Sequence, residues 1–98
     1  MKKIFTEKTY DTETATELTH WTNGYDCKDL HYCYEGLYQT KKGNYFIYGK
    51  SGALGKYSKL TFRGRWTNGE EIIPISVRGA KSWAARYLDG DKYSRIFG

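Results

Sequence analysis

The chain has 98 residues, of which 39% are hydrophobic and 17% aromatic, with ten tyrosines, two cysteines and a formal net charge of +5. This length gives room for a single domain, residues 1–98, and excludes a multidomain enzyme. Two cysteines cannot build a disulfide-rich secreted fold, and the apolar runs are too short to cross a bilayer, so the sequence predicts a cytoplasmic protein with no membrane partner.

The positive charge is concentrated in the second half of the chain. Residues 1–49 hold six basic and seven acidic side chains, whereas residues 50–98 hold ten basic and four acidic ones. No carboxylate side chain occurs between Gly36 and Gly69. This segregation indicates that the basic residues create a positive electrostatic field that attracts an anionic partner, instead of being scattered charges that only keep the protein in solution.

The N-terminal quarter predicts a short strand followed by a short helix. Residues 3–6 have the composition of a strand. Asp11 is the expected N-cap of the helix, because its carboxylate can accept a hydrogen bond from the N–H of Glu13 or the next residue. Asn23-Gly24 is a turn pair and is expected to end the helix. The many threonines lower helix propensity, so this helix needs support from tertiary packing.

A β-hairpin is the clearest feature of the chain. Two aromatic-rich runs within residues 32–49 flank a turn in which Gly43 can supply the positive φ that a tight hairpin requires. A lone hairpin is only marginally stable, so a further strand is expected beside it. Residues 71–75 are the best candidate, and Pro74 places that strand at an edge of the sheet.

The segment between the hairpin and this strand has the least defined pattern. It is rich in glycine and basic residues, and the large apolar residues available to anchor it are Leu54, Tyr57, Leu60, Phe62 and Trp66. The tetrapeptide Trp-Thr-Asn-Gly occurs at residues 21–24 and 66–69. Because the flanking sequences differ, it predicts two similar turns rather than an internal repeat.

The C-terminal part predicts an amphipathic helix capped by Ser76. Its apolar side, with spacings of three and four, consists of Val77, Ala80, Trp83, Ala84, Tyr87 and Leu88. Its opposite side consists of Arg78, Lys81, Ser82, Ala85 and Arg86, so it carries three basic side chains and no acidic one. One further helical turn is expected at residues 93–97. The expected fold class is therefore α+β, with a small antiparallel sheet of three or four strands, a central β-hairpin, a short N-terminal helix and this C-terminal helix.

Few residues of the chain could carry metal binding or catalysis. All cysteines and histidines lie close together in sequence, at His20, Cys27, His31 and Cys33. Four such ligands suggest zinc, but their spacing matches no zinc ribbon or finger, and the alternative is ordinary side chains in a loop and a strand. A Cys27–Cys33 disulfide is disfavoured in a reducing cytosol. Neither a triad pattern nor a phosphate-binding loop occurs, so the sequence predicts no cofactor and no enzymatic activity.

The basic and aromatic residues are the stronger functional signal. Lysines and arginines can neutralise phosphates, and exposed rings can stack on unpaired bases. The alternative is that the rings are core residues and the lysines only solvate the surface. The partner-binding candidates are Lys41, Lys42, Tyr48, Lys50, Lys56, Tyr57, Lys59, Arg63, Arg65, Trp66, Arg78, Lys81 and Arg86.

Three stretches of the chain resemble a known group of proteins. The first is residues 10–15 (Tyr-Asp-Thr-Glu-Thr-Ala), and the second runs from Leu37-Tyr38 through Gly43 to residues 46–49 (Phe-Ile-Tyr-Gly). The third is residues 72–76 (Ile-Ile-Pro-Ile-Ser) together with Ala80-Lys81, Trp83-Ala84, Leu88 and residues 93–98. In order and composition they are similar to short, mostly uncharacterised proteins of phages and integrative elements of Gram-positive bacteria. Anti-CRISPR proteins are the best-known proteins of this genetic setting.

The resemblance implies a non-enzymatic anti-defence protein in the cytoplasm of a host bacterium. The expected partner is a host defence nuclease, a Cas effector, or its nucleic acid, whose binding the protein would occlude. An accessory or regulatory nucleic-acid-binding module of the element is the alternative. The chain departs from the group in being basic where relatives tend to be acidic, at Lys50, Arg63, Arg65, Arg78 and Arg86, which argues against mimicry of DNA.

Overall fold

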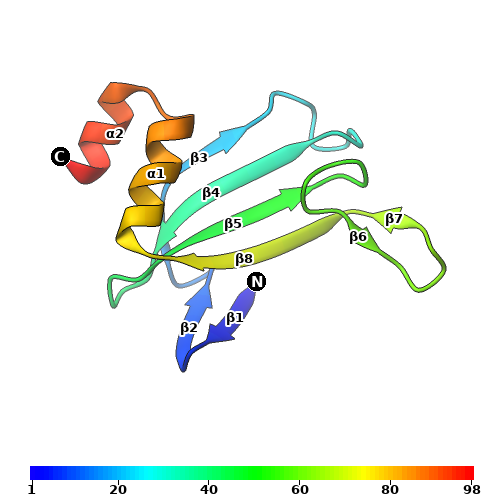
Figure 1. The fold of residues 1–98 in the computed structure, drawn as a ribbon, viewed down its shortest axis with the longest axis horizontal. Helices are drawn as coiled ribbons and strands as arrows, with labels where there is room; N and C mark the ends of the chain where they lie inside the picture. The colour runs from blue at the N-terminus through cyan, green and yellow to red at the C-terminus, as the bar shows by residue number, and fades with distance from the viewer.

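A four-stranded antiparallel sheet forms the body of the computed structural model, which describes residues 1–98 (Figure 1). Its strands are β3 (Thr16–Thr22), β4 (Cys33–Gln39), β5 (Tyr45–Ser51) and β8 (Gly69–Ile75), in the order β3-β4-β5-β8. The predicted central hairpin is β4 and β5, and Gly43 turns it with a φ of 92°. The strand with Pro74 lies at the edge, as predicted, where its missing N–H costs no ladder bond.

Two smaller hairpins extend from this sheet. At the N-terminus, β1 (Lys2–Phe5) pairs with β2 (Lys8–Asp11). In the chain between β5 and β8, β6 (Lys59–Leu60) pairs with β7 (Trp66–Thr67), and this hairpin projects from the end of the sheet that is remote from the helices (Figure 1). The second Trp-Thr-Asn-Gly stretch is therefore not a turn, because it forms β7 and the start of β8.

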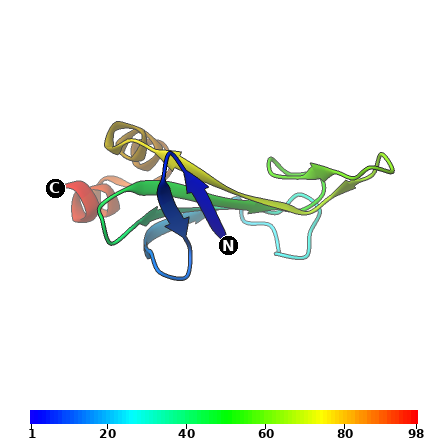
Figure 2. The same cartoon turned by 90° about the horizontal axis from the view of Figure 1, so that it is seen from below.

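Two helices follow the last strand. Helix α1 (Val77–Tyr87) begins at Ser76, whose hydroxyl accepts a hydrogen bond from the N–H of Gly79 at 3.0 Å, as the sequence predicts. Helix α2 (Gly90–Phe97) is the expected additional turn and is capped by Asp89. Both helices lie at one end of the sheet, and α1 crosses one of its faces (Figure 2). Neither helix has the length and hydropathy needed to cross a bilayer.

The predicted N-terminal helix is wrong. Residues 8–11 form β2 and residues 16–22 form β3, with only a turn between them. The capping bond itself exists, because the Asp11 carboxylate accepts from the N–H of Glu13 at 3.0 Å, but it closes a turn and not a helix. Threonines along the segment favour an extended backbone, and Tyr10 is buried on the sheet and so holds β2 in place.

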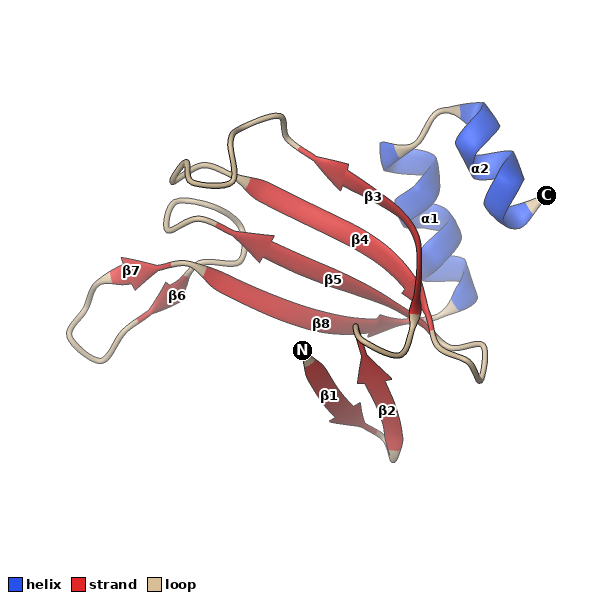
Figure 3. Ribbon diagram, turned by 180° about the vertical axis from the view of Figure 1, so that it is seen from behind, coloured by secondary structure: helices blue, strands red, loops and turns tan.

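The apolar side chains form two small clusters, one on each face of the sheet. Leu37 and Ile47 pack under α1 against Ala80, with Trp83 and Phe97 at the margin. On the opposite face, Tyr10 packs against Phe46 and Ile72. The structure confirms the predicted α+β class and the small antiparallel sheet, which has four of the three or four strands expected. It leaves the part of the second face beyond Tyr10 without a covering layer, as the view onto that face shows (Figure 3).

Candidate functional site: a projecting basic hairpin and an open sheet face

The candidate residues do not form one continuous face. Lys41 and Lys42 lie in the β4–β5 turn at one end of the sheet, and the hairpin of β6 and β7 projects from the other end (Figure 1). A third group, on the exposed side of α1, consists of Arg78, Lys81 and Arg86. The remaining candidates divide between the two faces of the sheet: Lys56 and Tyr57 on the helix side, Tyr48 and Lys50 on the other.

The projecting hairpin, residues 59–67, brings four candidates together and is called the basic arm below. They are Lys59, Arg63, Arg65 and Trp66. The arm contains no carboxylate and buries none of its side chains. Phe62 at its tip is 96% exposed, and the Arg63 guanidinium lies 5.6 Å from the centre of that ring. Leu60 and Trp66 are each 58% exposed, so these residues do not anchor the segment as the sequence suggests.

The turn of the basic arm is ordered by the same hydrogen bonds as the turn of the central hairpin. In the arm, the N–H of Gly64 donates to the carbonyl of Thr61 at 2.9 Å, and the N–H of Arg65 donates to the Thr61 hydroxyl at 3.2 Å. Gly43 and Asn44 donate in the same way to Thr40, at 2.9 and 3.0 Å. Both glycines have a positive φ. A Thr-x-x-Gly-x sequence therefore specifies each turn and holds the arm's tip residues in a fixed shape.

Two candidates, Lys56 and Tyr57, serve an internal cluster instead. The carboxylate of Glu35, which is 2% exposed, accepts from the Lys56 ammonium at 3.0 Å, from the Trp83 indole at 3.2 Å and from the Tyr57 hydroxyl. Tyr57 is itself buried. These bonds join β4, the loop after β5 and helix α1. The cluster therefore has a structural role, and neither residue is free to bind a partner except through the exposed part of Lys56.

The Glu35 cluster holds a buried carboxylate in its ionised form. Burial alone would raise the pKa of Glu35, but the hydrogen bonds from Tyr57, Lys56 and Trp83, with the Lys56 charge, outweigh it and lower that pKa from 4.5. The hydrogen bond to Glu35 raises the pKa of Lys56. Burial, and then the bond to the same carboxylate, raises the pKa of Tyr57. All three groups therefore keep their charge state across neutral pH.

The stability of the fold should fall in acid because of this cluster. A carboxylate with a lowered pKa in the folded state stabilises it fully above the unfolded value of about 4.5 and loses this contribution as pH falls through the folded pKa. We expect the free energy of unfolding, measured with urea, to be level near neutrality and to decline below that value. In Glu35→Gln the decline should be clearly shallower; an equal decline would assign the acid sensitivity to other carboxylates.

The face of the sheet opposite α1 carries Tyr48 and Lys50 together with rings that are not among the candidates from the sequence. Tyr34 and Tyr38 on β4 lie on this face, and both lean over Gly36 between them. A Cβ on that glycine would lie 2.5 Å from the Tyr34 hydroxyl and 2.8 Å from Cε1 of Tyr38. The spacing Tyr-x-Gly-x-Tyr in a strand places all three on one side, which is the sequence signal for this face.

Two carboxylates fix the rings of this face. The Tyr34 hydroxyl donates to Glu17 of β3, and the Tyr48 hydroxyl donates to Glu70 of β8. The ring centre of Tyr48 lies 6.2 Å from those of Tyr34 and of Tyr38, both at steep angles. The Lys50 ammonium lies 5.1 Å from the centre of the Tyr34 ring. The half-buried tyrosines of this face are thus held in defined positions, with a cation beside them.

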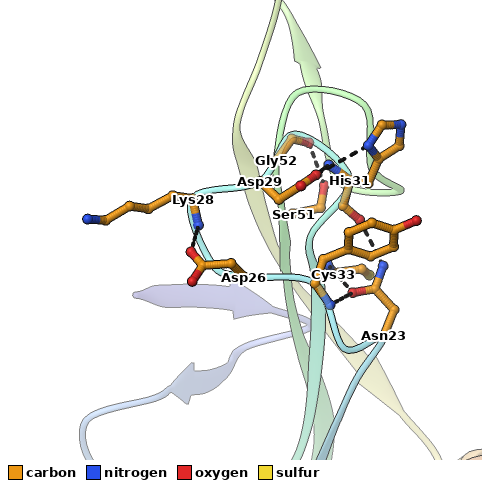
Figure 4. Close-up of polar contacts among 9 residues, drawn as sticks. Asn23, Asp26, Lys28, Asp29, His31, Cys33, Ser51 and Gly52 are labelled. Atoms are coloured by element: carbon orange, nitrogen blue, oxygen red, sulfur yellow. Dashed lines mark hydrogen bonds and ion pairs between the residues drawn. The ribbon is translucent and has the colours of Figure 1, made fainter.

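A cavity of about 360 Å³ opens at the end of this face. It lies between the loop of residues 23–32 and the adjoining ends of β5 and β8, and its lining includes Tyr32, Lys50, Asn68 and Glu70. The loop is shaped by side-chain bonds to its own backbone: Asn23 accepts from the N–H of Cys33 at 3.1 Å, and Asp26 and Asp29 each cap a turn (Figure 4). The cavity is therefore bounded by ordered backbone next to the base of the basic arm.

The four potential zinc ligands are not gathered into a site. No group of three or more histidine, cysteine or acidic side chains lies close enough to hold a metal ion. His31 pairs with Asp29 at 3.2 Å, and His20 pairs with Glu17 at 3.5 Å. Cys27 is exposed and Cys33 is buried, and both are free thiols. These residues therefore belong to the loop and the sheet and not to a common centre.

Comparison with protein-family models, with curated proteins and with solved structures found no match to the chain. A function consequently has to be inferred from the surfaces described above: the basic arm, the exposed side of α1, and the open tyrosine face with its cavity.

Proposed function

We propose that this protein is a non-enzymatic binding domain that attaches to an anionic macromolecule through the basic arm. The observation that carries the proposal is the composition of a projecting hairpin: three cations, no carboxylate, and a fully displayed ring at the tip. Removing the exposed Phe62 ring from water lowers the free energy, and this gain is realised only when a partner covers the ring. The neighbouring cations favour a partner of negative charge.

The setting we propose is inhibition of a host defence nuclease. In this form the arm enters the nucleic-acid channel of a Cas effector, or contacts its guide or target strand, and the rest of the domain blocks access by its bulk. The elongated shape, 45 Å in its longest dimension, suits a domain that inserts one end and occludes with the other. Plasmid interference, measured for several Cas effectors with and without this protein, tests this setting; unchanged interference throughout would contradict it.

A second candidate is an accessory nucleic-acid-binding module that needs no nuclease. The exposed Phe62 ring with Arg63 against its face favours this second candidate. The ring can stack on a base or insert between two bases while the guanidinium contacts a phosphate. Binding to free nucleic acid at two salt concentrations separates the two candidates. Useful affinity with a steep salt dependence favours the module, whereas co-purification with an effector and negligible free binding favours the inhibitor.

Charge reversal in the arm should abolish its contribution to binding. We expect Arg63→Glu with Arg65→Glu to weaken binding to a DNA duplex of mixed sequence and to lower the salt slope by about 2, since two phosphate contacts are lost. Both side chains are exposed, so the fold should persist, as circular dichroism can verify.

The matched control is Lys41→Glu with Lys42→Glu, which changes the net charge equally at the opposite end of the sheet. This variant should retain an affinity close to that of the unmodified protein. Equal losses in the two double variants would show that overall charge, and not the arm, determines binding.

A further inference from the structure

The open tyrosine face has the physical properties of a stacking platform. Gly36 has no side chain, which allows Tyr34 and Tyr38 to lean across it from either side. No helix lies over this face (Figure 3), and the cluster of Tyr10, Phe46 and Ile72 packs against Tyr38 and Tyr48 at one end of it. Within the face, Phe46 stacks on Tyr38 at 5.1 Å and His20 stacks on Tyr34 at 5.6 Å, so a ligand can use only the ring surfaces that these contacts leave exposed. Rings that are already held by neighbours lose little conformational entropy when a ligand stacks on them, so more of the contact energy is retained as affinity.

The charges around the rings restrict what can lie on them. Glu17 and Glu70 lie at the two sides of the face, bonded to the hydroxyls of Tyr34 and Tyr48. Carboxylates repel a phosphate backbone laid directly on the rings, but they accept hydrogen bonds from the exocyclic amino groups of bases. Lys50 is the cation of the face and lies over Tyr34. The chemistry therefore suits bases against the sheet and phosphates along one side.

The cavity supplies the place where such a strand continues. Lys50 and Glu70 belong both to the face and to the cavity wall, and Asn68 adds an amide that can pair with a base edge. Residues 68 and 69 follow directly on the basic arm, so one wall of the cavity adjoins the base of the arm. The arm's cations that have no acidic partner, Arg63 and Arg65, are the groups that would bind phosphates of the strand beyond the face, whereas Lys59 pairs with Glu71 at 3.6 Å.

We propose that the tyrosine face and its cavity bind the unpaired bases of a single-stranded nucleic acid, whose backbone runs on to the basic arm. This inference rests on the proposed function where the partner is a nucleic acid, and it names the class of nucleic acid. A duplex keeps its bases stacked and paired, so it can use the arm but not the face. The protein accordingly prefers single strands.

The experiment compares a labelled single strand of mixed sequence with the corresponding duplex, by fluorescence anisotropy at one salt concentration. We expect Tyr34→Leu with Tyr48→Leu to weaken single-strand binding about tenfold or more and to leave duplex binding unchanged. Tyr34→Phe with Tyr48→Phe keeps the rings and should retain most of the affinity, which separates stacking from the hydroxyl bonds. Tyr93→Leu on α2 removes a tyrosine away from the face and serves as the matched control.

The outcomes distinguish this inference from the proposed function. If the leucine variant keeps the single-strand affinity, or if the duplex binds as well as the single strand, the face is not a base-binding site. If Arg63→Glu with Arg65→Glu leaves both affinities unchanged, the arm proposal fails instead. If the unmodified protein binds neither the single strand nor the duplex, the inference about the face is overturned. The proposal that the basic arm is the attachment site is then tested by co-purification with a nuclease. Lys50→Glu, an exposed single change, repeats the test should the leucine variant unfold.

Discussion

Glu35→Ala is expected to lower the free energy of unfolding by about 3 kcal/mol, because it leaves the Tyr57 hydroxyl and the Trp83 indole N–H without their acceptor. For a domain whose total stability is about 5–15 kcal/mol, this is a large fraction. Urea denaturation followed by tryptophan fluorescence measures it directly, since Trp83 is one of the affected groups.

A matched control comes from a carboxylate of the edge strand β8. Glu71 pairs with Lys3 at 3.2 Å and Lys59 at 3.6 Å, but its side chain is 40% exposed, so Glu71→Ala should cost less than about 1 kcal/mol. Glu35→Gln keeps one acceptor oxygen in place and should lie between the two. A Glu35→Ala cost no larger than that of Glu71→Ala would mean that the cluster does not hold α1 and the loop on the sheet.

Gly49→Ala is expected to destabilise the protein by about 3 kcal/mol, although alanine suits a strand better than glycine does. The Tyr57 ring lies directly on Gly49, and a Cβ there would overlap its hydroxyl end. The ring would have to leave its buried position and its bond to Glu35. Thermal denaturation of the variant measures the loss.

A double-mutant cycle isolates the cause. In a Tyr57→Ala background the obstruction is gone, and Gly49→Ala should then cost less than about 1 kcal/mol. Gly90→Ala at the start of α2 is the matched control, because nothing lies within 4 Å of a Cβ at that position, and it should be neutral or slightly stabilising. Additive costs at residues 49 and 57 would show that the ring and the glycine do not depend on each other.

The parts of the fold that were predictable from the sequence are those that local chemistry determines alone. Gly43 between aromatic runs determines the central hairpin, Pro74 requires an edge strand, and Ser76 followed by an apolar stripe begins α1. The N-terminal helix failed because the bond from Asp11 to the N–H two residues on is common to an N-cap and to an isolated turn. Burial of Tyr10 decided between them, and burial is a property of the whole fold.

The candidate site was predictable only in part, for two different reasons. The basic arm buries nothing, so hydrophobic periodicity could not reveal it, but its Thr-x-x-Gly turn repeats that of residues 40–44 and was available in the sequence. The internal partner of Lys56 and Tyr57 could not be predicted from the sequence, because Glu35 is distant along the chain and meets them only in the folded structure. Charge counts along the chain cannot separate a lysine with an internal partner from one that is free.

The connection between β5 and β8 has an evolutionary consequence. These two strands pair along their whole length, and the basic arm is an outgrowth of the link between them. Its length and composition can therefore drift without disturbing the ladder beneath it, provided that Tyr57 and the strand ends remain. Related chains could exchange this tip for another and acquire a different target while they keep the same scaffold, so specificity in such proteins can change faster than architecture.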